Sequence, residues 1–190
     1  MADFKRRFII NSLIICFSGQ IGSGKTSISR EIANHLDYPW VSFGDYVRAL
    51  AKKNGLSATR DVLQDFGASL VKNKCEKFCK SVLNQADWHP GMNIILDGVR
   101  HVKILETIKQ ITAPSVVLLV YVDTSEKERK KRILLSRNTN LSDFKQHESH
   151  STEIDVKIKL KKLANIVVVN NDCSLNEVCL DIISRLYSLY

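Results

Sequence analysis

Short apolar runs alternate along this chain with longer segments in which apolar residues recur every three or four positions. Runs of this length are typical of buried strands, and the longer spacing is typical of amphipathic helices. The run 116–122 is the clearest, because every residue in it is apolar, as in a strand covered on both faces. We expect strands at Leu13–Ser18, Trp40–Ser42, Ile94–Asp97, 116–122 and Ile166–Val169.

Helical spacing fills the stretches between the predicted strands. We expect helices at 25–37, 45–54, Val102–Ile111, 125–136, 153–162 and 175–189, and two helical segments between residues 60 and 85. Strands and helices that alternate in this way predict a parallel sheet with helices on both faces. The expected fold is α/β, a three-layer α/β/α sandwich of five parallel strands in one domain, 1–190, with the 13–18 strand near its centre.

The segment after the first predicted strand carries the most informative motif. It reads GQIGSGKT and fits G-x-x-x-x-G-K-[ST], a phosphate-binding loop (P-loop) between a strand and a helix. Its glycines let consecutive N–H groups turn toward a polyphosphate, Lys25 can reach the β- and γ-phosphates, and Thr26 offers a hydroxyl to Mg²⁺. We therefore expect ATP and Mg²⁺ as cofactors. The candidate binding residues are Gly19, Gln20, Ile21, Gly22, Ser23, Gly24, Lys25, Thr26 and Ser27.

Acidic and basic residues near other strand ends are further candidates, because open α/β sheets bind ligands at the carboxyl ends of their strands. Asp97 ends an apolar run and would hold Mg²⁺ through water, beside Thr26. Asp45 and Arg48 follow the second strand. Arg48 would point toward a ligand above the P-loop, and Asp45 lies three residues before it on the opening turn of the predicted helix. A helix cap for Asp45 and a surface salt bridge for Arg48 stay open as alternatives.

Arg132 and Arg137 flank the end of the helix expected before a polar segment, 137–151. Arginines placed there can stabilise the charge of a phosphoryl group in transfer, since this chemistry depends on positioned cations. Solvation of a charged helix is the alternative for both. The segment 137–151 itself lacks a sustained apolar period, so it is either a surface connection or a lid over bound nucleotide.

Charge and composition narrow the class of partner. The 28 Lys and Arg exceed the 20 Asp and Glu, and the formal charge of +8 suits a nucleic acid, an anionic membrane or a small phosphorylated substrate. No stretch approaches the roughly 20 apolar residues of a membrane span, so we expect no membrane partner. The five cysteines form no C-x-x-C pair, and an odd count without a secretory signal favours a reduced, cytoplasmic chain.

The chain resembles the P-loop nucleoside monophosphate kinases of the adenylate-kinase-like group. The segment 41–49, VSFGDYVRA, is similar to one in which an arginine grips the acceptor phosphate, and 97–100, DGVR, is similar to another. The resemblance implies that Arg48 and Arg100 bind the acceptor phosphate, that 44–90 is an acceptor-binding helical region, and that 137–151 is a short lid. The ending VVNN at 168–171 is also similar to dephospho-CoA kinases and to adenylate-kinase-like proteins of archaeal type.

These observations lead to one hypothesis and two alternatives. The hypothesis is Mg·ATP-dependent phosphoryl transfer to a small acceptor, with a nucleoside or deoxynucleoside monophosphate favoured. The first alternative is a kinase for dephospho-CoA or another small molecule. The second is a nucleotide-binding regulatory or nucleic-acid-associated protein without turnover, in which the positive charge contacts a polynucleotide. The sequence lacks the N-K-x-D element of GTPase switches and the L-S-G-G-Q of transport ATPases, which argues against both.

Overall fold

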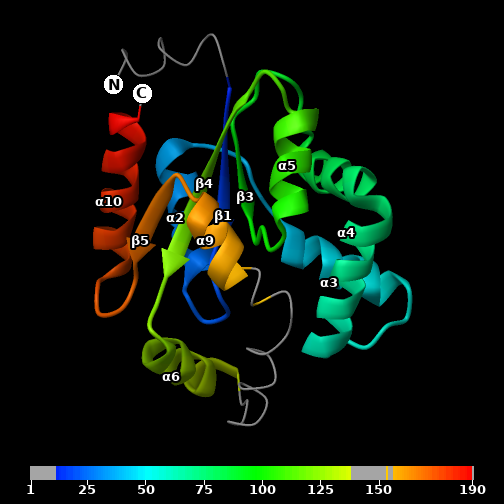
Figure 1. Cartoon of the computed structure of the whole chain (residues 1–190), viewed down its shortest axis with the longest axis horizontal. Coiled ribbons are helices and arrows are strands. Elements are labelled where there is room, and N and C mark those ends of the chain that lie inside the picture. The colour runs from blue at the N-terminus through cyan, green and yellow to red at the C-terminus, as the bar shows by residue number, and fades with distance from the viewer. Residues whose placement is uncertain (1–11, 138–152, 154–155, 190) are drawn as a thin grey trace.

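Five parallel strands form one sheet in the computed structural model, which describes residues 12–137, 153 and 156–189 (Figure 1). Their order across the sheet is β2-β3-β1-β4-β5, so β1 lies at the centre as expected. The strands are β1 (Leu13–Ser18), β2 (Trp40–Ser42), β3 (Ile94–Asp97), β4 (Val116–Asp123) and β5 (Ile166–Val169).

Alternation along β1 explains how the two faces of the sheet are filled. Ile14 and Cys16 belong to one buried cluster, and Ile15 and Phe17 belong to the other. β1 pairs with β3 on one side and with β4 on the other, so its backbone is satisfied along both edges. Every residue of β1 is buried, as the apolar run predicts.

Helices cover both faces, and the fold class predicted from the sequence is confirmed. α2 and α10 pack against one face, and α3, α4, α5 and η2 pack against the other (Figure 1). No helix among the described residues is both long and apolar enough to span a membrane. The helices are α2 (Lys25–Leu36), α3 (Phe43–Lys53), α4 (Arg60–Leu83), η1 (Asn84–Ala86), α5 (Val102–Ile111), α6 (Glu126–Arg137), η2 (Val156–Leu160), α9 (Lys161–Leu163) and α10 (Leu175–Ser188).

Helices differ from the expectation by more than one residue at three places. α3 begins at Phe43, because the Ser42 hydroxyl accepts the Asp45 N–H and so caps the helix directly from the end of β2. α4 is one continuous element with a non-helical residue at Lys74, where two segments were expected. The helix expected at 153–162 is a π-helix in η2 followed by the short α9, with residues 154 and 155 outside the described part.

The topology brings the carboxyl ends of the strands to one edge of the sheet. Ser42, Asp97 and Phe17 lie side by side in the register of β2, β3 and β1. The loop that follows β1 therefore starts next to Asp97, and α3 starts next to both. Residues separated by many positions in the sequence meet at this edge, which is where an open α/β sheet binds its ligand.

Candidate active site

The P-loop turns between β1 and α2 with a backbone that requires glycine at two positions. Gly22 and Gly24 have φ values of 77° and 84°, in the left-handed region. A Cβ on Gly24 would lie 2.6 Å from Asn170 Nδ2, and one on Gly22 would lie 2.9 Å from the Arg129 carbonyl oxygen. Gly24 is also the N-cap of α2 and supplies no side-chain cap, so the first N–H groups of the helix are available to an anion.

The back of the P-loop is fixed through the carbonyl oxygen of Ser23. Asn170 Nδ2 donates to this oxygen at 2.8 Å, and the Thr124 hydroxyl donates to it at 3.2 Å. Because the C=O and N–H of a trans peptide point in opposite directions, these bonds aim the Gly24 N–H away from the two donors. The buried Arg129 holds a second carbonyl of the loop, that of Ile21, at 3.4 Å.

Lys25 is the first residue of α2, and its side chain is buried. Burial and, after it, the positive charge of Arg100 lower the pKa of Lys25 from 10.5 to about 8, although the negative charges of Asp97 and Glu153 act in the opposite direction. The negative charge in this site is therefore too small to offset the burial of the ammonium group and the neighbouring positive charge. A bound polyphosphate would supply the missing negative charge.

Thr26 and Asp97 form the pair of oxygen donors expected for a metal. The Thr26 hydroxyl donates to Asp97 Oδ2 at 2.8 Å. The other carboxylate oxygen, Oδ1, is buried and has no hydrogen-bond partner within the described part of the chain. Burial raises the pKa of Asp97. A hydroxyl beside a carboxylate with one oxygen to spare fits Mg²⁺, which prefers oxygen ligands and keeps several waters.

A buried carboxylate joins the P-loop to two arginines. Glu153 is fully buried, and its Oε2 accepts the Ile21 N–H at 3.2 Å. Its Oε1 binds Arg60 Nη2 at 3.1 Å and also binds Arg100. Burial alone would raise the pKa of this carboxyl, but the positive charges of Arg100, Lys25 and Arg60 lower it from 4.5 to about 2. The two arginines and the Ile21 N–H thus surround one anion, which in this structure is the carboxylate of Glu153.

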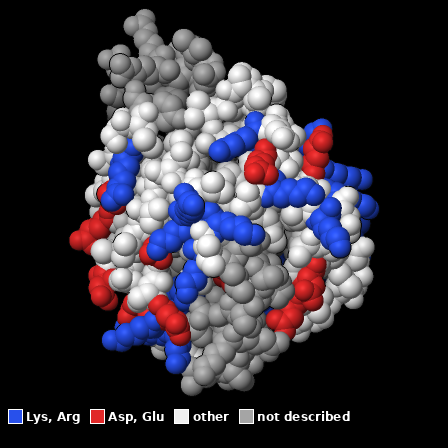
Figure 2. Space-filling view, in the orientation of Figure 1, with Lys and Arg blue, Asp and Glu red and all other residues white. Residues whose placement is uncertain are grey.

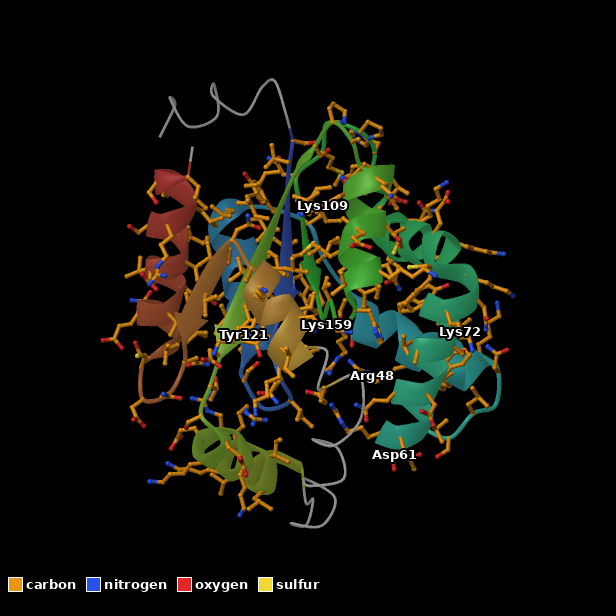
Figure 3. The ribbon with its side chains drawn as sticks, viewed as in Figure 1. Arg48, Asp61, Lys72, Lys109, Tyr121 and Lys159 are labelled. Carbon is orange, nitrogen blue, oxygen red and sulfur yellow. The ribbon has the colours of Figure 1, made fainter. Side chains whose placement is uncertain are left out.

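A cavity of about 420 Å³ lies beside this cluster, between α3, α4 and the segment that follows β3. Three arginines contribute to its wall, and most of the remaining lining is apolar. Figure 3 labels Arg48 beside α3. The lining residues are Phe43, Gly44, Val47, Arg48, Ala58, Arg60, Leu63, Gln64, Gly67, Ala68, Val71, Phe78, Gly98, Arg100, His101 and Ile104.

The expected acceptor residues lie at this cavity in different ways. Arg48 and Arg100 both line it, although 52 positions separate them in the sequence. Asp45 pairs with Arg48 and lies 3.8 Å from Arg30, and the side chains of Asp45 and Arg48 are 43% and 59% exposed. Asp45 is not among the lining residues, so its contact with the cavity is through Arg48.

Of the two candidate arginines of α6, the structure describes the side chain of Arg132 and not that of Arg137. Arg132 lies beside the P-loop and donates to the carbonyl oxygens of Asn171 at 2.7 Å and Ser23 at 3.5 Å. Its guanidinium thus binds main chain in this structure. Arg137 is the last residue of α6, and its side chain, like the rest of the expected lid at 137–151, lies outside the described residues.

Comparison with known proteins gives the family. A family model described as an AAA domain matches residues 15–154, which span the P-loop, Arg48, Arg100 and Glu153. The chain belongs to this family. A protein named cytidylate kinase from Pyrobaculum islandicum is 28% identical over 173 residues, which cover 89% of this chain and 83% of that protein.

Solved structures resemble the fold at lower identity. An uncharacterized protein from Eubacterium ventriosum has a TM-score of 0.62 at 13% identity and covers 93% of this chain and 99% of its own. A gluconokinase from Sinorhizobium meliloti has a TM-score of 0.58 at 16% identity and covers 95% and 94%. The comparisons confirm the resemblance to P-loop kinases and the enzyme class that the sequence predicts.

Sequence reasoning missed three groups that contribute to the site. Arg60 opens α4 after an unremarkable polar turn, and Glu153 follows a polar stretch with no motif around it. Gln64 lies one turn after Arg60 and reads as an ordinary polar residue of a helix. Arg60 and Glu153 meet through a contact between distant segments, and the Gln64 amide is buried by the packing around α4, for which a single sequence carries no local signal.

Proposed function

We propose that this protein transfers the γ-phosphoryl group of ATP to the phosphate of a nucleoside or deoxynucleoside monophosphate. An oxygen of the acceptor phosphate forms the new bond to the γ-phosphorus, and the bond from that phosphorus to the β–γ bridging oxygen breaks. The products are ADP and a nucleoside diphosphate. The observation that carries the proposal is the Glu153 carboxylate, which joins a P-loop N–H to two cavity arginines and so marks a point where both sites can hold an anion.

The donor side of this site consists of the P-loop, Lys25 and the pair of Thr26 and Asp97. Loop N–H groups and the Lys25 ammonium would bind the β- and γ-phosphates. Thr26 would ligate Mg²⁺, and Asp97 would hold one of its waters. When bound, the metal would neutralise charge on the transferring phosphates. The residues of this chain then have to position the phosphates and exclude water.

The acceptor side consists of the arginines in the cavity wall. Arg48 and Arg100 would bind the acceptor phosphate, because a guanidinium matches phosphate oxygens with two parallel N–H groups. Asp45, paired with Arg48, would orient that arginine or a metal-bound water. Arg132 and Arg137 would stabilise charge in the transition state. For Arg132 this requires exchange of at least one of its two carbonyl partners for a phosphoryl oxygen.

Relatives and surface charge favour a small acceptor over a polynucleotide. The relative from Pyrobaculum islandicum is named cytidylate kinase, and a nucleotide acceptor suits a cavity of about 420 Å³. Figure 2 displays Lys and Arg side chains interspersed with Asp and Glu on the visible face. A kinase for dephospho-CoA or a sugar acid remains the alternative, since the P-loop half of the site would be the same. The free cysteines suit the cytoplasmic location that we propose.

An acceptor panel tests the proposal. The protein is incubated with Mg²⁺, γ-labelled ATP and, separately, the common ribo- and deoxyribonucleoside monophosphates, dephospho-CoA, gluconate and shikimate. We expect label in a nucleoside diphosphate, and no label transfer by the Lys25→Ala variant. Label in a sugar hydroxyl of dephospho-CoA would support the alternative. Tight binding to a polynucleotide with no transfer to any acceptor would contradict kinase function.

A further inference from the structure

Gln64 places an unsatisfied amide in the wall of the cavity. Its Oε1 and Nε2 are both buried, and neither has a hydrogen-bond partner within the part of the chain that the structure describes. A buried amide without partners costs free energy, so proteins seldom retain one unless a ligand or water completes it. Both atoms are unpaired in the same side chain, so a ligand can use the donor and the acceptor together.

The position of Gln64 relative to the arginines defines what that ligand is. Arg60 and Gln64 are four residues apart in α4, so both lie on the same face of one helix, one turn apart. Arg48 and Arg100 contribute to the same cavity. An acceptor whose phosphate binds Arg48 and Arg100 has its sugar and base to place against the rest of the wall, which includes Gln64. The amide edge of Gln64 carries one donor and one acceptor side by side, as a nucleobase edge does.

The apolar part of the wall suits a flat ring. Phe43 and Phe78 line the cavity and pack edge to face, with 5.3 Å between their ring centroids. Leu63 and Val71, from the same helix as Gln64, extend this surface. A planar base can bury both of its faces against such groups while it presents its polar edge to one amide.

We propose that Gln64 reads the hydrogen-bonding edge of the acceptor base and sets the base specificity of this enzyme. The inference rests on the proposed function and adds the group that is recognised: a base edge with a donor next to an acceptor, such as N4 and N3 of cytosine. The paired bonds form only when the base presents both groups. An analogue that lacks one of them leaves the buried amide half unpaired, and the site rejects it.

The test compares two acceptors in three proteins. The first acceptor is the best monophosphate from the panel, and the second is its analogue without the exocyclic group. That analogue is pyrimidin-2-one riboside 5′-monophosphate for a pyrimidine and purine riboside 5′-monophosphate for a purine. The proteins are the wild type, Gln64→Leu and the control Gln110→Leu, which alters an exposed glutamine of α5. We expect kcat/KM to favour the natural acceptor by about 100-fold in the wild type and the control, and by less than about 10-fold in Gln64→Leu.

Thermal unfolding shows whether the Gln64→Leu variant is still folded. Gln64→Leu removes an unpaired buried amide and keeps a similar volume, so its unliganded melting temperature should equal or exceed that of the wild type. An unchanged preference in a folded Gln64→Leu protein would overturn the role of Gln64 and leave the proposed function intact. A wild type that phosphorylates no nucleoside monophosphate would overturn both.

Discussion

Glu153 accepts a hydrogen bond from the main-chain N–H of Ile21, at 3.2 Å, across 132 positions of the sequence. The same carboxylate holds Arg60 and Arg100, so one internal anion satisfies a P-loop amide and two arginines at once. A phosphate that binds the same N–H groups has to replace the carboxylate, because each N–H donates to one of the two at a time. Glu153 and the ligand are therefore competitors for the same cations.

Substitution of Glu153 by glutamine tests this competition. Glu153→Gln leaves two arginines beside a neutral amide, and loss of one partner from a buried ion pair costs about 3 kcal/mol or more. We expect the unliganded variant to melt several degrees lower than the wild type and inorganic phosphate to raise its melting temperature more than that of the wild type. Glu106→Gln, at an exposed position of α5, serves as the control. An equal response to phosphate in both proteins would contradict the competition.

The pH dependence of stability gives an independent measure of the same contact. The pKa of Glu153 is about 2 in the folded protein against 4.5 for the free group, so the ionised form stabilises the fold above pH 4.5. That contribution is lost as pH falls from about 4.5 to 2. We expect the loss of unfolding free energy over this range, followed by urea titration at each pH, to be smaller in Glu153→Gln than in the wild type. Parallel curves for the two proteins would contradict the lowered pKa.

The parts of this molecule that the sequence predicts are those set by neighbouring residues. Four of the five strands have the predicted bounds, and β4 is one residue longer, because apolar runs identify buried strands directly. The P-loop is contiguous, so its conformation follows from its own glycines. The start of α3 was placed too late, because β2 runs into the helix without a loop and Ser42 serves both elements.

The acceptor half of the site depends on contacts that no local pattern encodes. Arg60 meets Glu153 across 93 positions, and both would read as surface charges in isolation. Gln64 is distinguished only by the absence of a partner for its buried amide in the described structure, which depends on the packing of α4 against α3 and α5. Arg48 was a candidate from its place after the second strand, and its acceptor role and that of Arg100 were predicted only because the segments around them resemble those of known kinases.

Removal of the Lys25 ammonium should raise the stability of the unliganded protein and lower its activity. The pKa of Lys25 is lowered to about 8, so its charged form destabilises the unliganded fold at neutral pH, and this cost declines as pH rises from about 8 toward 10.5. We expect Lys25→Met to gain roughly 2 kcal/mol of unfolding free energy at pH 7 and to lose phosphoryl transfer by at least about 10²-fold. Urea denaturation and label transfer measure the two effects. A less stable variant would contradict the unfavourable environment of this ammonium.

The pair of Thr26 and Asp97 should determine the requirement for Mg²⁺. Asp97→Asn keeps the shape of the side chain and removes its charge, so water held between this residue and the metal binds less strongly. We expect the Mg²⁺ concentration for half-maximal transfer to rise about 10- to 100-fold, as for other groups that act through a metal-bound water. Because burial raises the pKa of Asp97, the variant should be no less stable than the wild type without ligand. An unchanged Mg²⁺ requirement would exclude Asp97 from the metal site.

Loss of Arg48 should weaken binding of the acceptor and leave binding of ATP nearly unchanged. Arg48 lines the cavity, and within the described part of the chain no ion pair or hydrogen bond joins it to the P-loop or to Glu153. Its loss should therefore weaken binding of the acceptor phosphate and not of ATP. We expect Arg48→Ala to raise the acceptor KM about 10- to 100-fold, with less than about a threefold change in the KM for ATP. Arg48→Lys should recover only part of this, because an ammonium cannot donate two parallel bonds. Arg185→Ala, which breaks an exposed ion pair with Asp181 on α10, provides the control. Equal increases in both KM values would mean that Arg48 acts on the site as a whole.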